Sequence, residues 1–340
     1  MFGFGSMAVD WGRVQLAKSQ LQHAADAAAR FGAIGLENDS ATARANAIAV
    51  AAQNLADGTP VALDPALDIS FGSWDSTTHK FTAAAAGAED SATTVKVTAR
   101  RLASRGNPIP LMLAQVLGYK SCDVSVTSIA VYTRGQQTQM DVSSNSNPWL
   151  SGMPYGTVAN PGNPHNNPDY AGNASDPKQS PVQVTSVPIV PGKLMSFDSI
   201  NGGANNFNTR TLFTPDGNTA WLTDNLLGAE HGHSDVFAPI NAVMGVFLGP
   251  GNPETDGVSV PPNLDFSSPG ARNFQTLSPQ LKQVFFIGDG RSDDGSTQTF
   301  VVPQGATRLF IGTMDEYEWN NNVGDYKVTI HRLGSVSLVK

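Results

Sequence analysis

The sequence has very little cysteine. Cys122 is the single cysteine among 340 residues, so the chain cannot form an internal disulfide and cannot hold a metal cluster built on cysteines. Long apolar runs are also missing. The apolar stretch at the start ends at Val9, far short of the roughly 20 residues of a membrane-spanning helix, and it does not have the pattern of a signal peptide.

Motifs of the common catalytic folds are absent as well. The sequence contains no nucleophile elbow, zinc-protease helix, phosphate-binding loop or dinucleotide-binding fingerprint. No pair of carboxylates stands out as the acid and base of a glycosidase. The sequence therefore predicts a protein that is not an enzyme.

Charged residues are scarce, at 15%, and the two signs are unevenly distributed. Residues 1–134 contain 11 Lys and Arg and 11 Asp and Glu, which leaves the whole net charge of −8 in residues 135–340. An acidic second half argues against nucleic acid as a partner and suits a surface that binds cations. Low charge with 33 Gly and 22 Pro is typical of β-rich extracellular proteins, so we expect an exported protein at the cell surface or outside the cell.

Two Ala-rich helices are predicted in the first 60 residues. From Met7 to about Leu36, apolar residues recur at three- and four-residue spacing, which is the pattern of a helix with one buried face. A second helix is predicted from Ser40 to about Leu55, with Asp39 or Ser40 as its N-cap. Because both helices are rich in small residues, we expect them to pack closely as a pair.

Residues 59–134 contain short runs in which apolar and polar residues alternate, which predicts strands. The expected strands are 69–74, 80–82, 93–102 and 123–132, with a short helix at 109–117. An antiparallel sheet with helices on one side makes residues 1–134 a predicted α+β domain of pilin-like design.

The segment AVDWGR at residues 8–13 and the Ala-rich helix that follows it resemble the start of TadE/TadG-type pilus-assembly proteins. The resemblance covers roughly residues 1–134. It implies an ectodomain that begins with this helix and a membrane helix directly before it. In this sequence the membrane helix is missing or reduced to a stub, so we expect contact with a membrane only through a missing or truncated N-terminal anchor.

The same start of the chain allows a second interpretation. A short apolar segment on a long Ala-rich helix can pack against sister chains, which predicts self-association through the N-terminal helix into a filament.

Residues 135–180 are rich in Asn, Pro, Gly and Ser and have almost no apolar periodicity, which predicts an irregular junction. Trp149 and Leu150 stand among these turn-forming residues. Because a plain linker has no use for large apolar side chains, we expect this part to dock onto the domain that follows.

Residues 181–332 alternate short apolar runs with Gly, Pro and Asn turns and have no convincing long helix. Strands are expected at 182–189, 193–199, 238–248, 284–287, 300–302, 308–312 and 326–330, with a short helix at 278–282. About seven strands in this length predict an all-β sandwich, and residues 333–340 are expected to form a tail.

A long polar loop between the last two predicted strands gathers oxygen atoms. It contains the carboxylate of Asp315, the side-chain amides of Asn321 and Asn322, and the backbone carbonyls between them. Long polar loops between good strands are uncommon unless they have a function, and crowded carboxylate, amide and carbonyl oxygens are the ligands that calcium requires. The loop therefore predicts a Ca²⁺ site. The alternative is a hairpin loop whose Asn and Gly residues serve turn geometry.

The order of an Asp, a spacer, an Asn-Asn pair and a Gly entering the last strand resembles the bacterial calcium-dependent galactose-binding lectins of the LecA type. The resemblance implies a lectin-like β-sandwich. It also implies that Asp315, Asn321 and Asn322 bind calcium through their side chains, and that Glu318 binds it through its backbone oxygen.

The same resemblance assigns a further backbone carbonyl ligand to Asn205 or Asn206. In that family the calcium ion also holds two hydroxyl groups of a sugar, so carbohydrate is the implied ligand. The side-chain ligands of the ion would then contact the sugar as well, and Trp319 is the expected aromatic contact.

His231 and His233 are the remaining candidates for a site. On a strand, alternate positions put both rings on one face, which would suit a transition metal, although no third ligand follows at a recognisable spacing. The alternative, which we favour, is that His231 or His233 donates a hydrogen bond to the bound sugar.

These observations predict a two-domain, non-catalytic bacterial surface or pilus-associated protein. Its pilin-like domain would serve assembly, and its lectin-like domain would bind calcium and carbohydrate for adhesion. The alternative is a structural subunit of an extracellular filament, in which N-terminal helices pack together and calcium only stabilises the sandwich.

Overall fold

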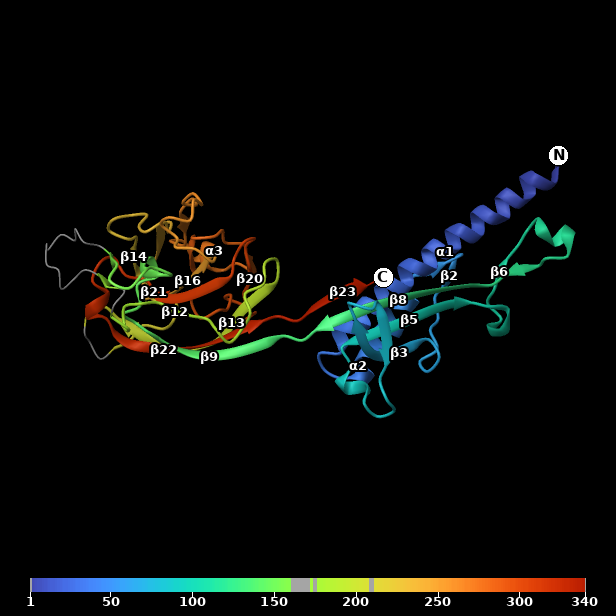
Figure 1. Cartoon of the computed structure of the whole chain (residues 1–340), viewed down its shortest axis with the longest axis horizontal. Helices are drawn as coiled ribbons and strands as arrows, with labels where there is room; N and C mark the ends of the chain where they lie inside the picture. The colour runs from blue at the N-terminus through green and yellow to red at the C-terminus, as the bar shows by residue number, and fades with distance from the viewer. Residues whose placement is uncertain (1, 160–171, 174–175, 208–210, 340) are drawn as a thin grey trace. The chain divides into compact units, whose positions relative to one another are not determined.

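The computed structural model describes residues 2–159, 172–173, 176–207 and 211–339 (Figure 1). The chain divides into two compact units. Unit 1 consists of Met1–Arg134 together with Gly334–Lys340, and unit 2 consists of Gly135–Leu333. Unit 2 is therefore inserted into unit 1, because the last residues of the chain return to the first unit.

Unit 1 is built from two long helices, short helical turns and a set of strands. The helices are α1 (Phe2–Gly35) and α2 (Ser40–Ala52), and the turns are η1 (Glu89–Ser91), η2 (Ala103–Arg105) and η3 (Ala114–Leu117). The strands are β1 (Leu55–Ala56), β2 (Thr59–Pro60), β3 (Ile69–Asp75), β4 (Lys80–Ala83), β5 (Thr94–Arg101), β6 (Ile109–Pro110), β7 (Ser121–Cys122), β8 (Val124–Thr133) and β23 (Ser335–Val339).

The two predicted helices are confirmed, and small residues explain how closely they pack. A Cβ atom at Gly35 would lie 2.5 Å from the Cα of Ala43 in α2, so only glycine allows this approach. The N-cap of α2 is Asp39, whose carboxylate accepts a hydrogen bond from the backbone N–H of Thr42 at 2.6 Å. α1 contacts α2 on one side and strands β5 and β8 on another.

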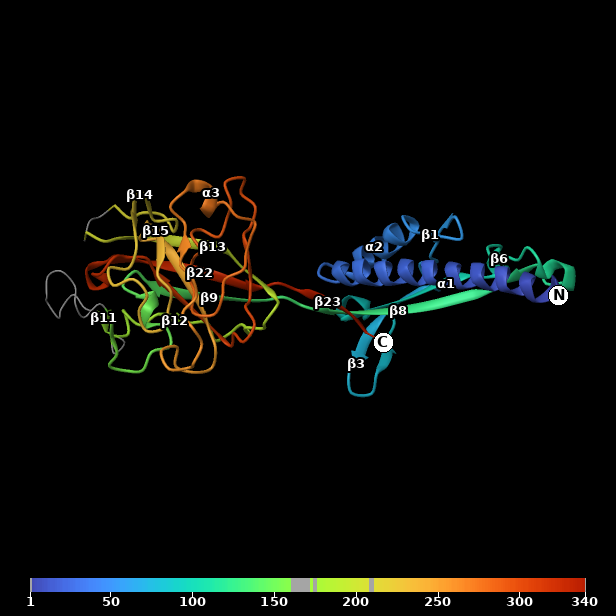
Figure 2. The ribbon, with the colours of Figure 1, turned by 90° about the horizontal axis from the view of Figure 1, so that it is seen from above.

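The main sheet of unit 1 has the strand order β23-β8-β5-β3-β4 and is antiparallel throughout. Both helices lie on the same side of this sheet (Figure 2). The strands predicted at 69–74, 80–82, 93–102 and 123–132 are confirmed as β3, β4, β5 and β8. Residues 335–339, expected to be a tail, instead form an edge strand on β8.

The helix predicted at 109–117 is wrong. Pro110 lacks an N–H donor and disfavours a helical conformation at Ile109, so these two residues extend as β6 and pair with β7. Only the 3-10 turn η3 remains of the predicted helix, at the tip of a hairpin.

Unit 2 consists almost entirely of strands. These are β9 (Gln136–Ser143), β10 (Val158–Ala159), β11 (Gly172–Asn173), β12 (Val182–Gln183), β13 (Leu194–Asn205), β14 (Asn218–Thr223), β15 (Val236–Ile240), β16 (Val243–Leu248), β17 (Leu264–Asp265), β18 (Thr276–Leu277), β19 (Val284–Phe286), β20 (Thr299–Val301), β21 (Arg308–Thr313) and β22 (Val323–Arg332). The short helical elements are η4 (Pro148–Leu150), α3 (Pro269–Arg272) and η6 (Trp319–Asn321).

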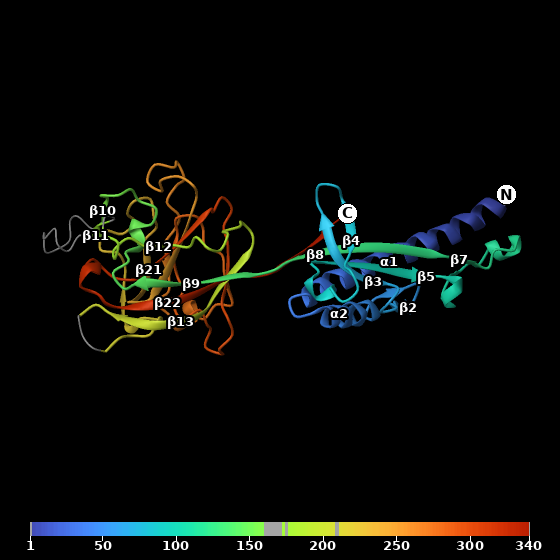
Figure 3. The ribbon, with the colours of Figure 1, turned by 60° about the horizontal axis from the view of Figure 1, so that its bottom comes forward.

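Two larger sheets and one smaller sheet share the core of unit 2. The strand orders are β12-β21-β16-β19, β18-β20-β13-β22-β9 and β14-β15-β17. Figure 3 shows β9, β22 and β13 side by side, with β22 in the middle. Buried aromatic side chains from both larger sheets meet in one hydrophobic cluster, including Phe197, Phe247, Phe285, Phe300 and Tyr326.

The predicted junction, residues 135–180, contains a long strand that the sequence pattern did not indicate. Residues 136–143 form β9, which pairs with β22 along its length. Trp149 belongs to the core cluster of unit 2 and Leu150 is buried, so the prediction that this segment docks onto the following domain is confirmed. Two other predictions are wrong: residues 184–189 lie outside β12, and residues 278–282 contain no helix, with a turn at 281–282 in which Lys282 has φ 66°.

Candidate metal centre

The polar loop connects β21 to β22, and a buried tryptophan holds its middle. Trp319 is fully buried and donates a hydrogen bond from Nε1 to the carbonyl oxygen of Thr313 at 2.7 Å. Its ring meets that of Trp149 edge-on, with 5.7 Å between the ring centroids. The buried side chain of Trp319 therefore anchors the loop in the core and holds the neighbouring polar residues in place.

A second segment, just after β9, supports the loop from the side. Asn145 donates hydrogen bonds from Nδ2 to the carbonyl oxygens of Trp319 at 2.5 Å and Asn322 at 3.2 Å. Asn322 in turn donates from its own Nδ2 to the carbonyl oxygen of Ser144 at 2.9 Å. These bonds fix the side chain of Asn322, since its amide nitrogen is committed to Ser144.

Several oxygen atoms around the loop are buried and have no hydrogen-bond partner in the described part of the chain. They are Oδ2 of Asp315 and the Oδ1 atoms of Asn321, Asn322 and Asn206. Strand pairing between Asn205 and Val323 brings Asn206 next to the end of the loop. Buried acceptors without a partner cost about 1–3 kcal/mol each, and these four belong to residues of the loop and of the segment that follows the strand paired with the end of the loop.

The side chains of the two predicted backbone ligands, Glu318 and Asn205, are engaged in other hydrogen bonds. The side chain of Glu318 accepts a hydrogen bond from Nδ2 of Asn321 at 2.7 Å, which fixes the orientation of the asparagine. The backbone oxygen of Glu318 accepts one bond, from the N–H of Asn321 at 3.1 Å. The side chain of Asn205 is bonded to Thr211 and Phe207, so Asn205 has only its backbone oxygen to offer.

Burial raises the pKa of Asp315 to about 7. The backbone N–H of Glu316 and the side chain of Asn322 lower this pKa, while the carboxylates of Glu318 and Glu316 raise it further. A carboxylate that is 4% exposed and faces other carboxylates is costly to ionise unless a cation compensates it. The donor set of one carboxylate, several amide oxygens and backbone carbonyls fits Ca²⁺.

The two histidines do not form the arrangement that the sequence suggested. Glu230 and His233 pair across a tight turn in which His231 has φ 50°, so the rings do not share one face of a strand. His233 is fully buried, and this burial lowers its pKa to about 4. Ring atom Nε2 of His231 lies 3.0 Å from the carbonyl oxygen of Val158. The described residues contain no group of three or more His, Cys, Asp or Glu side chains placed to hold a metal ion.

The structure therefore corrects two predicted sugar contacts. His233 has no exposed surface with which to donate a hydrogen bond to a ligand, and Trp319 has no exposed ring face. Another aromatic pair, which the sequence analysis missed, lies near the polar loop. Phe207 and Trp221 are 61% and 38% exposed and lie with their ring centroids 5.4 Å apart. Phe207 directly follows the candidate ligand Asn206 in the sequence, and this adjacency could have marked Phe207 as a residue near the site.

Two family models match the N-terminal part of the chain. Residues 1–35 match a family described as putative Flp pilus-assembly TadE/G-like, and residues 22–130 match one described as putative Tad-like Flp pilus-assembly. No curated protein and no solved structure matches the chain. The N-terminal part is therefore Tad-like, as residues 8–13 indicated.

The Tad-like matches lie within unit 1 and do not include the polar loop of unit 2. They associate the N-terminal part of the chain with Flp pilus assembly. Within the described residues, no helix combines the length and the apolar character that crossing a membrane requires.

Proposed function

We propose that unit 2 is a lectin-like, two-sheet sandwich that binds Ca²⁺ in its 315–322 loop and, through the ion, carbohydrate. Unit 1 supports a pilus-associated setting, because both family matches describe Flp pilus assembly. The protein would thus be a non-catalytic adhesive component at the cell surface. The observation that carries the calcium proposal is the set of buried, unpartnered oxygens on Asp315, Asn321, Asn322 and Asn206.

In this proposal the side chains of Asp315, Asn321 and Asn322 bind the ion directly. Asn206 adds a fourth side-chain oxygen, and Glu318 and Asn205 add backbone carbonyls. The bound ion supplies open coordination positions for vicinal hydroxyl groups of a sugar. The protein itself fixes the amide oxygens, because the partner nitrogens are committed to Glu318 in the case of Asn321 and to Ser144 in the case of Asn322.

The loop provides a matched pair of variants for the calcium site. We expect Asn322→Ala to abolish calcium binding or to weaken it more than about a hundredfold, because a ligand and its support are lost together. Asn320→Ala changes the same residue type in the same loop, but its side chain is exposed and outside the set of unpartnered oxygens. It should bind calcium normally.

Calorimetric titration of calcium into the chelator-treated full-length protein measures this difference. A response lost in Asn322→Ala and kept in Asn320→Ala supports the site. Equal binding by both variants would assign the calcium to another place, and no binding by the wild type would refute the proposal.

The exposed aromatic pair replaces Trp319 as the surface on which a sugar ring would stack. We expect Trp221→Ala to weaken sugar binding at least about tenfold while calcium affinity stays unchanged, because stacking on an aromatic ring is lost and the loop is untouched. Tyr155→Ala, which removes a ring that is 87% exposed elsewhere in unit 2, is the control.

The measurement is a titration with galactose, mannose, fucose and N-acetylglucosamine, with calcium and with chelator. Binding that persists in chelator contradicts coordination of the sugar by the ion. Calcium binding without a response to any of these sugars or to a wider glycan panel favours the structural alternative below.

A structural filament subunit is the second candidate, and one observation favours it. Leu16, Phe31 and Ile34 are 61%, 52% and 47% exposed on α1, and Leu16 and Ile34 lie about five helical turns apart on the same line. Such a line of apolar side chains suits packing against other copies of the helix. Regular fibres in electron micrographs that disappear in Leu16→Asp would support this function, and calcium would then only stabilise unit 2.

A further inference from the structure

The hairpin β6–β7 carries an exposed apolar tip beside the beginning of α1 (Figure 1). No charged residue occurs between Arg105 and Lys120. Within this stretch Met112, Val116, Leu117 and Tyr119 are 65%, 89%, 66% and 68% exposed. Exposed large apolar side chains are common singly, but a contiguous group of this size marks an interaction site.

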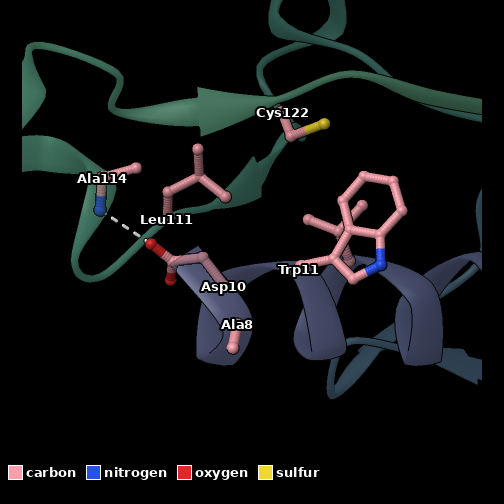
Figure 4. A pocket seen from close by; sticks show the side chains of 7 residues that line it. Ala8, Asp10, Trp11, Leu111, Ala114 and Cys122 are labelled. Carbon is pink, nitrogen blue, oxygen red and sulfur yellow. Dashed lines mark hydrogen bonds between the residues drawn. The ribbon is translucent and has the colours of Figure 1, made fainter. Parts of the chain in front are cut away.

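α1 extends the same apolar region. Trp11 is 67% exposed and, together with Leu111 and Cys122 of the hairpin, lines an apolar cavity of about 410 Å³ (Figure 4). Trp11 and the hairpin therefore present one continuous apolar surface.

Asp10 ties the two segments together in an unusual way. Its carboxylate accepts hydrogen bonds from the backbone N–H groups of Met112 at 2.9 Å, Leu113 at 2.9 Å and Ala114 at 2.7 Å. These bonds, led by that of Met112, lower the pKa of Asp10. The carboxylate of Asp10 is thus directed at the hairpin backbone (Figure 4).

Other backbone donors of the tip are satisfied within the hairpin. The N–H of Leu111 donates to the carbonyl of Lys120, that of Gly118 to Gln115, and that of Tyr119 to Ala114. Each N–H group that is satisfied in this way lowers the cost of moving the tip out of water and into a lipid phase. A protein partner would not require this, because it could supply the missing acceptors itself.

We propose that this tip, together with Trp11 of α1, inserts into the interfacial region of a lipid bilayer. Trp11 and Tyr119 belong to the residue types that concentrate at membrane interfaces, and Lys120 at the base of the tip can meet lipid head groups. The insertion is shallow and formed by side chains, unlike a spanning helix. It stands independently of the proposed calcium site.

The test uses the full-length protein and vesicles of phosphatidylcholine, alone or with one quarter phosphatidylglycerol. Wild-type protein should float with both kinds of vesicle. Brominated acyl chains should quench the fluorescence of Trp11, which is the part of the tryptophan emission that is lost in Trp11→Phe. Leu117→Asp should weaken binding at least tenfold. The control is Leu67→Asp, which puts the same charge on a leucine of unit 1 with the same exposure, 66%, and it should bind like the wild type.

Each other outcome overturns the inference. Equal binding by Leu117→Asp and Leu67→Asp would show that the tip is not inserted. Binding only to the anionic vesicles, lost in high salt, would show adsorption by charge. Lipid-independent dimers in sedimentation that Leu117→Asp converts to monomers, with no vesicle binding, would assign the surface to a second copy of the chain.

Discussion

Replacing Asp315 by asparagine is expected to stabilise the calcium-free protein at pH 8 and to abolish its response to calcium. The reason is the burial of this carboxyl group, which raises its pKa to about 7, compared with 3.8 for an ordinary aspartate. Asparagine keeps the shape and an acceptor for the N–H of Glu316, which lies 2.6 Å from Oδ1 of Asp315. It removes the charge that the calcium-free site cannot compensate.

The sign of the pH dependence follows from the two pKa values. Between about pH 4 and pH 7 the folded protein keeps a proton on Asp315 that the unfolded chain has lost, so the free energy of unfolding falls as pH rises. The total loss across this window is about 4 kcal/mol, and the stability is fully present only below pH 4. At pH 8 in chelator the Asp315→Asn variant should therefore melt about 10 °C above the wild type.

Calcium should reverse this order. Saturating calcium stabilises the wild type and leaves Asp315→Asn unchanged, because the variant lacks the anionic ligand. Since calcium competes with the proton on Asp315, wild-type affinity should be about tenfold weaker at pH 6 than at pH 8.

Thermal melts of both proteins at pH 5 and pH 8, with calcium and with chelator, measure these effects. The difference between variant and wild type isolates Asp315, because other buried carboxyl groups such as Asp216 and Asp235 are present in both. Equal melting of the two proteins at pH 8 in chelator would contradict the buried, uncompensated carboxylate.

Local patterns predicted most of the longer helices and strands of unit 1. Helix periodicity, the Asp39 cap and alternating strands gave α1, α2, β3, β4, β5 and β8 nearly residue by residue. Apart from the helix that Pro110 excludes, the errors arose where long-range pairing decides the structure. Residues 335–339 become the strand β23 only because β8 offers its edge, 200 residues earlier in the chain. No local pattern carries that information.

In unit 2, chain turns and polar strands limited the prediction. The single strand expected at 238–248 is two strands, because Asn241 at φ 66° breaks the run between β15 and β16. β9 has the polar sequence QQTQMDVS and was assigned to the junction, since only its pairing with β22 makes it a strand.

The candidate metal site was likewise only partly predictable. The types and order of Asp315, Asn321 and Asn322 were visible in the sequence, and each has a buried side-chain oxygen without a partner in the described residues. Trp319 was misassigned, because sequence alone does not tell whether a tryptophan in a polar loop faces the solvent or anchors the loop. The supporting role of Asn145 could be seen only in the fold, because Asn145 lies 174 residues before Trp319 in the sequence.

The second large effect is expected from Trp149→Ala. Trp149 is fully buried, packs on Trp319, and donates a hydrogen bond from Nε1 to the carbonyl oxygen of Ser234 at 3.1 Å. Truncation leaves a cavity and an unpaired carbonyl, so unit 2 should lose about 3–5 kcal/mol of unfolding free energy. Chemical denaturation of the full-length protein in chelator measures the loss.

The same variant should also bind calcium about ten- to a hundredfold more weakly, although Trp149 contacts no proposed ligand. Trp149 supports Trp319, and Trp319 holds the turn that presents Asn321 and Asn322, so a loosened anchor disorders the oxygens. Trp221→Ala is the matched control, because that ring is partly exposed and its loss should leave calcium affinity unchanged. Unaltered calcium affinity in Trp149→Ala, at a temperature where the variant is folded, would mean that the loop keeps its geometry without the tryptophan pair.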